Sequence, residues 1–277
     1  VGGAIAADVH GKNHHVAGSF AGHVTSFDIV FPNAEQTEPH TVTREADPEL
    51  FWATAGGMGL TGFITSATIS LKRVESSLVK VDTVKTRDID ETMAVLAEHD
   101  QKYGYTVAWS DDLATGGRLG RSIITSGDFA TRDDLDAKQR SAPFAFDPRA
   151  RLAAPKVFPP GLMNRHSIRL ANAAWYLKAP RHREHEIQTI SQFFHPLDGI
   201  RNWNRVYGPG GFRQYQYVMP FGAEAAVRRS FEMVSAHRAP SFVTVLKRFG
   251  QADPGLLSFP AAGLSLIHIS EPTRQAE

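Results

Sequence analysis

The chain has 277 residues, of which 42% are hydrophobic, and 30 basic and 29 acidic residues give it a formal net charge of +1. This length and composition suit one or two globular domains, and the balanced charge gives no indication of a nucleic-acid partner. The sequence has no cysteine, which excludes disulfides and thiolate metal sites. It also has no apolar run near the roughly 18 residues that would predict a transmembrane helix.

Residues 1–15 combine features that suit a phosphate-bearing redox cofactor. Gly2 and Gly3 let the backbone approach a ligand closely, because neither has a Cβ. Four consecutive residues then combine different chemical groups. His10 provides a titratable ring, Gly11 a flexible joint, Lys12 a cation and Asn13 an amide. Pyrophosphate needs backbone N–H groups and positive charge, and a redox ring needs hydrogen-bond donors and tight walls.

Two other interpretations of this segment stay open from the residues alone. His10 and His14 have the i, i+4 spacing of a helical metal site, but Gly11 interrupts such a helix and Asp8 is the one carboxylate nearby. A plain polar loop is the other interpretation. We expect no metal.

A strand is predicted over 24–31, and residues 41–43 continue a sheet. Asp47 as a cap and Pro48 at the first helical position then predict a helix over 49–55. The following glycines at 57, 59 and 62 match GxGxxG formally, but a dinucleotide loop must follow a strand and open a helix. Here a helix precedes the glycines and the alternating run 63–71 predicts a strand after them.

The pattern changes over 72–77, where we place a domain boundary. Beyond it we expect strands at 78–84, 105–110, 122–126, 212–220 and 242–249. Helices are expected after Asp88, with Glu91 as a capping partner, and over 223–237. Residues 141–165, with five of the 16 prolines, predict a long loop. Strands interspersed with two or three helices indicate an α+β domain with an antiparallel sheet.

Two strands place polar side chains among apolar ones. Gln214 and Gln216 share one face of their strand, and Val245, Lys247 and Phe249 share a face of theirs. Two amides on such a face either pair with each other or bind the hydroxyls of a sugar. Lys247 is either a snorkelling surface lysine or a contact for a phosphate or ribose.

Several long stretches resemble one known family, and together they cover nearly all of 1–263. They are GGAIAADVHGKNHH at 2–15, AGSF at 17–20, FWATAGGMGLTG at 51–62, FFHPLDGIRNWNRVYGPGGF at 193–212, QYQYVMP at 214–220 and LSFP at 257–260. These stretches resemble the vanillyl-alcohol-oxidase-like FAD oxidoreductases. The resemblance implies an α+β fold with a partial split FAD-binding (PCMH-type) domain over 1–72 and a substrate-binding domain over 77–263.

The resemblance also assigns roles to residues. His10 and Lys12 are the expected catalytic residues at the flavin–substrate interface. The FAD contacts are expected at Val1, Gly2, Gly3, His10, Gly11, Lys12, Asn13 and the backbone of Ile64. The substrate pocket is expected at Trp109, Phe194, Gln214, Gln216, Val245, Lys247 and Phe249. The family often has Tyr at Phe194 and Ser at Val107, so these departures put part of the substrate pocket in doubt.

The activity implied by the resemblance is FAD-dependent oxidation of the ribose C2 hydroxyl of a polyprenyl-phosphate sugar. An NAD(P)H-dependent ketoreductase partner would complete the epimerisation to arabinose, for cell-wall arabinan. Peripheral membrane association is compatible with such a substrate, and the side of the membrane stays open. The alternatives are a related aldonolactone or alditol oxidase, and a non-catalytic remnant of the fold without its cofactor.

Both ends of the chain look unlike those of a natural protein. Val1 stands inside a motif, and residues 264–274 (LSLIHISEPTR) resemble the conceptual translation of a sequencing adapter. We therefore expect 264–277 to lie outside the natural sequence, without a buried apolar face. We also expect further flavin-binding segments before Val1 and after the last residue, including a companion Lys and Tyr.

Overall fold

The computed structural model describes residues 1–32, 38–148, 150, 152–155, 164–208, 211–237, 241 and 243–270. The chain divides into two compact units. Unit 1 comprises Val1–Arg73 and Phe249–Gly263, and unit 2 comprises Val74–Arg248 and the described residues from Leu264 onward. Residues 249–263 therefore belong with the first segment of the chain, whereas the sequence analysis assigned them to the second domain.

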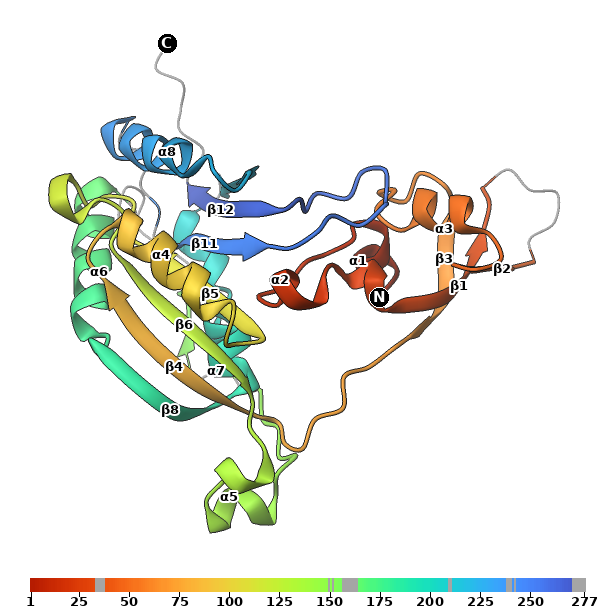
Figure 1. Cartoon of the computed structure of the whole chain (residues 1–277), viewed down its shortest axis with the longest axis horizontal. Helices are drawn as coiled ribbons and strands as arrows, with labels where there is room; N and C mark the ends of the chain where they lie inside the picture. The colour runs from red at the N-terminus through yellow and green to blue at the C-terminus, as the bar shows by residue number, and fades with distance from the viewer. Residues whose placement is uncertain are drawn as a thin grey trace. The chain divides into compact units, whose positions relative to one another are not determined.

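Unit 1 is built on a three-stranded antiparallel sheet in the order β2-β1-β3 (Figure 1). Its strands are β1 (Val24–Val30), β2 (His40–Thr43) and β3 (Phe63–Ile69). The core combines the apolar sides of β1 and β2 with the helix α3 (Pro48–Thr54), and includes Phe27, Ile29, Val42 and Phe51. The strand predicted after the glycine turn is confirmed as β3, which excludes a Rossmann phosphate loop at this place.

Helix α3 begins as its sequence predicts. The side chain of Asp47 accepts a hydrogen bond from the amide of Leu50 at 3.0 Å, and Pro48 occupies the first turn. The turn after α3 requires glycine at Gly57, because a Cβ there would lie 2.0 Å from the carbonyl oxygen of Ala53. The glycine run is thus needed to end this helix tightly.

Unit 2 contains a seven-stranded sheet in the order β10-β12-β11-β5-β6-β4-β8. The strands are β4 (Leu78–Thr86), β5 (Tyr105–Ser110), β6 (Ser122–Phe129), β8 (His182–Thr189), β10 (Arg213–Met219), β11 (Val243–Phe249) and β12 (Gly263–Ser270). The pairs β4–β6, β4–β8, β5–β6, β5–β11 and β10–β12 are all antiparallel. The predicted α+β class with an antiparallel sheet is therefore confirmed.

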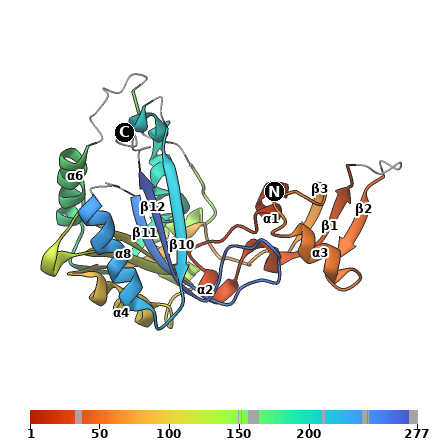
Figure 2. The ribbon, with the colours of Figure 1, turned by 90° about the horizontal axis from the view of Figure 1, so that it is seen from above.

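The two faces of this sheet have different covers. Helices α4 (Ile89–His99) and α8 (Glu224–His237) pack on one face, around Ala108, Ile124 and Leu246 (Figures 1 and 2). The other face carries a smaller aromatic cluster beside α7 (Ile190–Phe194). The remaining elements of unit 2 are α5 (Ala137–Ser141), α6 (Arg165–Lys178), β7 (Leu152–Ala153), β9 (Ile200–Arg201) and the 3-10 helices η2 (Gly116–Arg118), η3 (Arg132–Asp134), η4 (Pro196–Gly199) and η5 (Trp203–Tyr207).

Helix α6 and strand β8 are two of the longer elements that the sequence did not predict. Helix α6 carries apolar residues on its outer as well as its inner side, so it shows no single apolar stripe. The strand β8 (HREHEIQT) is a charged edge strand with little apolar alternation, which suits an edge that must not pair with another chain. Among the described helices, none is long and apolar enough to cross a membrane.

The expectation that residue 264 onward lacks a buried apolar face is wrong for the described part of that segment. Strand β12 fills the place between β10 and β11, and Leu264, Leu266 and Ile269 are buried. Leu264 and Leu266 share one face and Ile269 lies on the other, so both faces of this central strand are apolar and buried, whatever the origin of these residues. Residues 271–277 lie outside the described residues, and the adapter origin stays a prediction.

The role of Asp88 as the N-terminal cap of α4 can be tested by substitution. Its carboxylate accepts the amide of Glu91 at 2.9 Å, whereas the Glu91 carboxylate accepts the amide of Arg87 and not that of Asp88. We expect Asp88→Ala to lower the free energy of unfolding by about 1 kcal/mol, measured by urea denaturation, because one helical amide loses its acceptor. Asp133 is exposed, so the control variant Asp133→Ala should change the free energy of unfolding by less than about 0.5 kcal/mol. Equal effects of the two variants would contradict the capping role.

Candidate functional site

The first 23 residues of unit 1 form short helices joined by an irregular turn. They are α1 (Gly2–Ala6), α2 (His14–Ala17) and the 3-10 helix η1 (Phe20–His23), where the sequence predicted a glycine loop. The amides of Gly56 and Met58 donate to the carbonyls of Ile5 and Ala6 at 3.0 and 2.8 Å. These bonds hold α1 against the glycine turn that follows α3.

His14 is buried and uses both of its ring nitrogens. Nδ1 accepts a hydrogen bond from the amide of Gly250 at 3.0 Å, and Nε2 lies 3.1 Å from the hydroxyl oxygen of Ser19. Because Nδ1 accepts, the proton of the neutral ring is on Nε2, which donates to Ser19. His14 therefore fastens residues 249–263 to the N-terminal segment.

Asp8 makes a second connection of the same kind. It is buried with a positive φ of 42°, a conformation that is uncommon for any residue other than glycine. One carboxylate oxygen accepts the amide of Ala21 at 2.8 Å, and the other accepts the hydroxyl of Ser258. Both anchors lie beside His10 in the sequence, so they fix the turn that presents it.

The ring of His10 packs between two phenylalanines from residues 249–263. Its centroid lies 4.7 Å from that of Phe249 and 6.1 Å from that of Phe259, and Phe249 also lies 4.6 Å from His14. An expected catalytic residue and an expected substrate residue are therefore in contact within unit 1. This contact gives the physical reason why 249–263 belongs to unit 1.

Lys12 is the half-buried cation of the same turn. Burial lowers its pKa from 10.5 to about 8, because the charged ammonium loses water more than the neutral amine does. A lysine in this state gains from a nearby anion, which would restore the solvation that burial removes.

Two of the expected cofactor residues meet through their backbones. A Cβ added at Gly2 would lie 3.4 Å from the carbonyl oxygen of Ile64, and one added at Gly3 would have no neighbouring atom within 4 Å. Gly11 is close to Asn13, whose side-chain oxygen would lie 2.6 Å from a Cβ at Gly11. Backbone without side chains at Gly2 and Gly3, and a half-buried lysine in the same N-terminal segment, fit a flat, anionic cofactor such as FAD. Among the described residues, no group of three or more His, Asp or Glu could hold a metal ion.

In unit 2, five of the expected substrate residues share the face of the sheet opposite α4 and α8. Ala108, Leu246 and Tyr217 pack towards those helices, so their neighbours along the strands face the other way. Those neighbours include Trp109, Val245, Lys247, Gln214 and Gln216. Val245 lies opposite Trp109 in the β11–β5 register.

The polar members of this face differ in their surroundings. Lys247 is only 6% exposed, which does not fit a snorkelling lysine that keeps its ammonium in water. The Gln216 amide donates to the hydroxyl of Ser265 at 3.0 Å, whereas Gln214 is exposed. The two glutamines do not form a mutual pair among the described hydrogen bonds.

Phe194, the remaining expected substrate residue, lies in the aromatic cluster of α7. Its ring is stacked with Phe129 at a centroid distance of 5.8 Å and meets Tyr105 edge-on at 4.9 Å. The half-buried ring therefore also stabilises the sheet, so replacing it would affect packing as well as any ligand.

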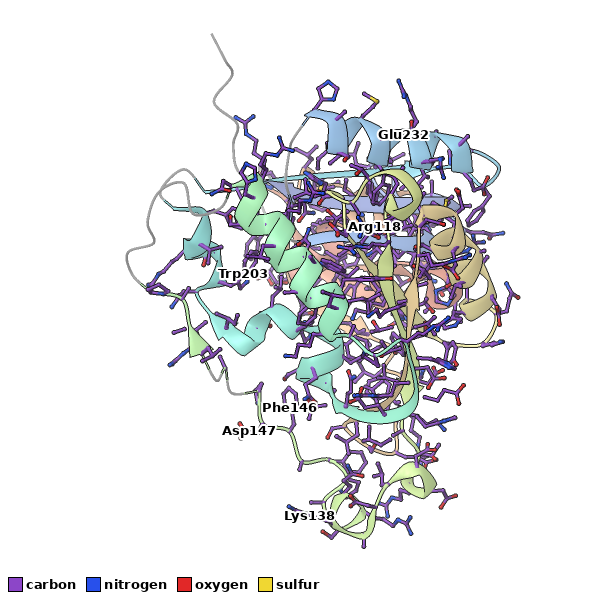
Figure 3. The ribbon with its side chains drawn as sticks, turned by 90° about the vertical axis from the view of Figure 1, so that its left-hand side faces the viewer. Arg118, Lys138, Phe146, Asp147, Trp203 and Glu232 are labelled. Carbon is purple, nitrogen blue, oxygen red and sulfur yellow. The ribbon has the colours of Figure 1, made fainter. Side chains whose placement is uncertain are left out.

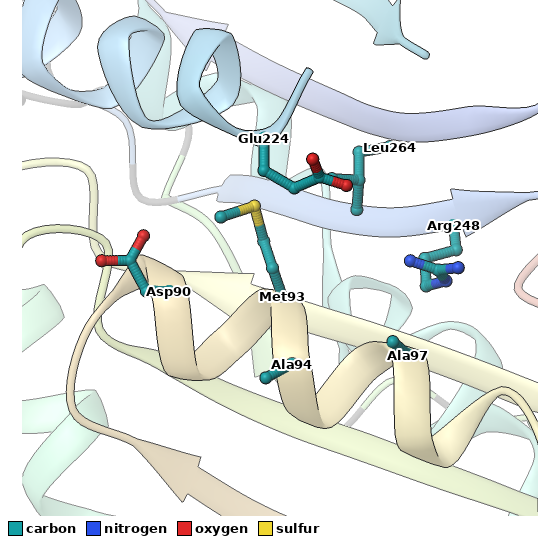
Figure 4. A pocket seen from close by; sticks show the side chains of 7 residues that line it. All are labelled: Asp90, Met93, Ala94, Ala97, Glu224, Arg248 and Leu264. Atoms are coloured by element: carbon teal, nitrogen blue, oxygen red, sulfur yellow. The ribbon is translucent and has the colours of Figure 1, made fainter. Parts of the chain in front are cut away.

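A pocket on the opposite face is unrelated to the predicted residues. It has a volume of about 290 Å³ and is lined by Asp90, Met93, Ala94, Ala97, Glu224, Arg248 and Leu264 (Figure 4). Arg248 there pairs with Asp100 at 2.9 Å. None of the expected catalytic, cofactor or substrate residues lines this pocket.

Comparison with known proteins finds several relatives, including the following two. Decaprenylphosphoryl-β-D-ribose oxidase of Mycolicibacterium smegmatis is 39% identical over 264 residues, which cover 95% of this chain and 57% of the oxidase. An uncharacterised protein in the mprA 5′ region of Streptomyces coelicolor is 36% identical over 276 residues, which cover 96% of this chain and 72% of that protein. The chain belongs to the decaprenylphosphoryl-β-D-ribose oxidase family. It spans little more than half the length of the oxidase, and no family model matches it.

The residues that hold the candidate flavin turn together were not predicted from the sequence. Asp8, His14 and Ser258 all lie in stretches that resemble this family, but sequence patterns do not show that they form long-range hydrogen bonds. His14 was considered only as a metal ligand, and its buried structural bonds replace that interpretation.

The lowered pKa of Lys12 can be measured directly. In protein with ¹³C-labelled lysine, the Cε resonance that disappears in Lys12→Arg should titrate with a midpoint near 8. The ammonium form then predominates below that pH, and added FAD should raise the midpoint because a bound anion favours the charged form. A midpoint near the unperturbed value of about 10.4 would show that Lys12 is solvated.

The fastening role of His14 has its own test. We expect His14→Ala to reduce the free energy of unfolding by about 2 kcal/mol, since it leaves a buried amide without its acceptor. Hydrogen exchange at the Gly250 amide should become faster in the same variant. His166→Ala, at an exposed position, serves as the control for both measurements, and a Gly250 amide that stays protected in His14→Ala would contradict the role.

Proposed function

We propose that this protein is an FAD-dependent oxidoreductase that oxidises the ribose C2 hydroxyl of a polyprenyl-phosphate sugar. One observation carries the proposal. Unit 1 contains both the turn with His10 and Lys12 and the close approach of Gly2 to the carbonyl oxygen of Ile64. The relative named as an oxidase of decaprenylphosphoryl-β-D-ribose supports the substrate class.

In this proposal, FAD is held by the N-terminal turn. Val1, Gly2, Gly3, Gly11, Asn13 and the backbone of Ile64 would provide the surface for the cofactor. When bound, the flavin accepts the two electrons that leave the sugar. Lys12 binds an anionic group of the ligand, and His10, fixed against Phe249, orients the reacting sugar.

The substrate is recognised by the polar face of the unit 2 sheet. Gln214 and Gln216 bind hydroxyl groups of the sugar, and Trp109 and Val245 provide apolar surface for the ring. Lys247 binds the phosphate, because a buried ammonium gains most from a partner that carries full negative charge. Phe194 provides aromatic surface for the same ligand in unit 2, and Phe249 provides it beside His10 in unit 1.

The wider role that we propose is the first half of an epimerisation. The ketone product would be reduced by an NAD(P)H-dependent ketoreductase partner to give the arabinose epimer, a precursor of cell-wall arabinan. The C2 stereocentre is lost on oxidation and set again on reduction, so two active sites suffice for the inversion.

The proposal predicts which variants lose activity. In FAD-loaded protein, His10→Ala and Lys247→Ala should each lower kcat/KM for polyprenylphosphoryl ribose at least tenfold, roughly 1.4 kcal/mol of transition-state stabilisation. The rate is followed by reduction of a dye acceptor, and retention of FAD by flavin absorbance. Lys102→Ala and His166→Ala replace the same side chains at exposed positions and should leave the rate unchanged.

Two results would reject this function. Unchanged turnover in both site variants with FAD bound would remove these residues from the reaction. Faster oxidation of an aldonolactone or an alditol than of the lipid-linked ribose would identify the protein as an oxidase of another substrate.

A further inference from the structure

Helix α6 exposes an apolar stripe where a surface helix ordinarily exposes polar residues. Leu170, Ala174 and Leu177 have the i, i+4, i+7 spacing that places them on one side of the helix. Leu170 and Leu177 are each 73% exposed, and Trp175, on the flank of the exposed side, is 54% exposed. Figure 3 looks onto this helix, which runs across the front of unit 2.

The opposite side of α6 is fixed to the sheet by specific bonds. Asn172 is buried and donates to the Asp111 carboxylate at 3.2 Å and to the Ser241 carbonyl at 3.1 Å. The Tyr176 hydroxyl donates to the carbonyl of Thr86 at 2.9 Å. The orientation of the helix is thus set by its inner side, and the apolar stripe is the side left to solvent.

The segment that carries this stripe is rich in positive charge. From Arg165 to Arg183 the chain has five Arg or Lys and no Asp or Glu, although the whole chain is nearly neutral. Arg165, Arg169 and Lys178 form no ion pair with the part of the chain that the structure describes. The same excess extends back along the sequence, since residues 148–183 contain eight Arg or Lys and no acid; the sequence analysis considered only the overall balance of charge.

Helix α8 shows what an ordinary outer face looks like in this protein. It has the same length of 14 residues, but its exposed side carries charges of both signs, and Arg228 and Arg229 pair with Glu232. The exposed Met233 lies on this helix, where Arg228 and Arg229 are both paired. The apolar and basic face is thus a local property of α6.

We infer that the outer face of α6 docks on an anionic lipid bilayer. Exposed leucines with a tryptophan on the flank, bordered by basic residues such as Arg169 and Lys178, are typical of helices that lie in the interface of a membrane. The basic residues attract anionic headgroups, and the leucines enter the boundary of the acyl chains. A nucleic acid would leave the leucines without a partner. The inference deepens the proposed function, because a polyprenyl-phosphate substrate resides in a bilayer, but it stands on α6 itself.

Vesicle binding tests the inference without FAD or sugar. Wild-type protein should co-sediment with vesicles of phosphatidylcholine and phosphatidylglycerol (7:3) and far less with phosphatidylcholine alone. Leu170→Gln with Leu177→Gln should lower the partition coefficient at least tenfold, and Arg169→Gln with Lys178→Gln should lower it and flatten its salt dependence. Met233→Gln and Arg229→Gln on α8 are the matched controls and should bind like wild type.

Tryptophan emission provides a second readout that does not depend on the folding of the leucine variants. The blue shift of emission on adding anionic vesicles should be lost in Trp175→Phe, since Trp175 enters the interface. Unchanged partition of the double leucine variant, or an unchanged blue shift in Trp175→Phe, would overturn the inference. The inference would also be overturned if the stripe instead joins two copies of the chain. In that case the wild-type protein would be a dimer, the double leucine variant would be a monomer, and both would bind vesicles.

The outcome is separable from the proposed function. Sugar oxidation in detergent solution without vesicle binding would reject the docking face and leave the oxidase. Vesicle binding through α6 without sugar oxidation would reject the oxidase and leave the docking face.

Discussion

The hydrogen bond from the Gly250 amide to Nδ1 of His14 joins residues 236 positions apart, and the candidate flavin turn depends on it. The bond returns residues 249–263 to the N-terminal unit after the chain has completed most of unit 2. It brings Phe249 against His10, and Ser258 within reach of Asp8. A buried polar ring with both nitrogens satisfied holds this arrangement in one geometry, because any displacement leaves a buried donor or acceptor unpaired.

The two faces of the seven-stranded sheet of unit 2 differ in chemistry. One face is apolar and is covered by α4 and α8, which supplies the burial that stabilises the unit. The other carries the amides, the buried Lys247 and Trp109. Because side chains alternate along each strand, the same strands serve both faces. A change at Ala108 or Leu246 would therefore affect stability, whereas under the proposed function a change at their neighbours would affect ligand recognition.

The position of β12 in this sheet can be filled by any segment that meets a few simple requirements. The position between β10 and β11 needs an extended segment that can be buried on both faces, and residues 264–269 provide this whatever their origin. Burial of Leu264 and Leu266 is thus a consequence of the central place of the strand in the sheet. It carries no information about whether these residues are native to the family.

The sequence by itself determined the elements that have local causes. The Asp47 and Asp88 caps, the glycine turn and the alternating strands follow from hydrogen bonds and periodicities within a few residues, and the long matching stretches determined the family. Only the tertiary structure decided which distant segments meet. The assignment of 249–263 to unit 1, the structural role of His14 and the exposed stripe of α6 depend on packing between residues far apart in the chain. Apolar residues on both sides of a helix do not reveal which side is buried, and no local pattern shows which amide a histidine will accept.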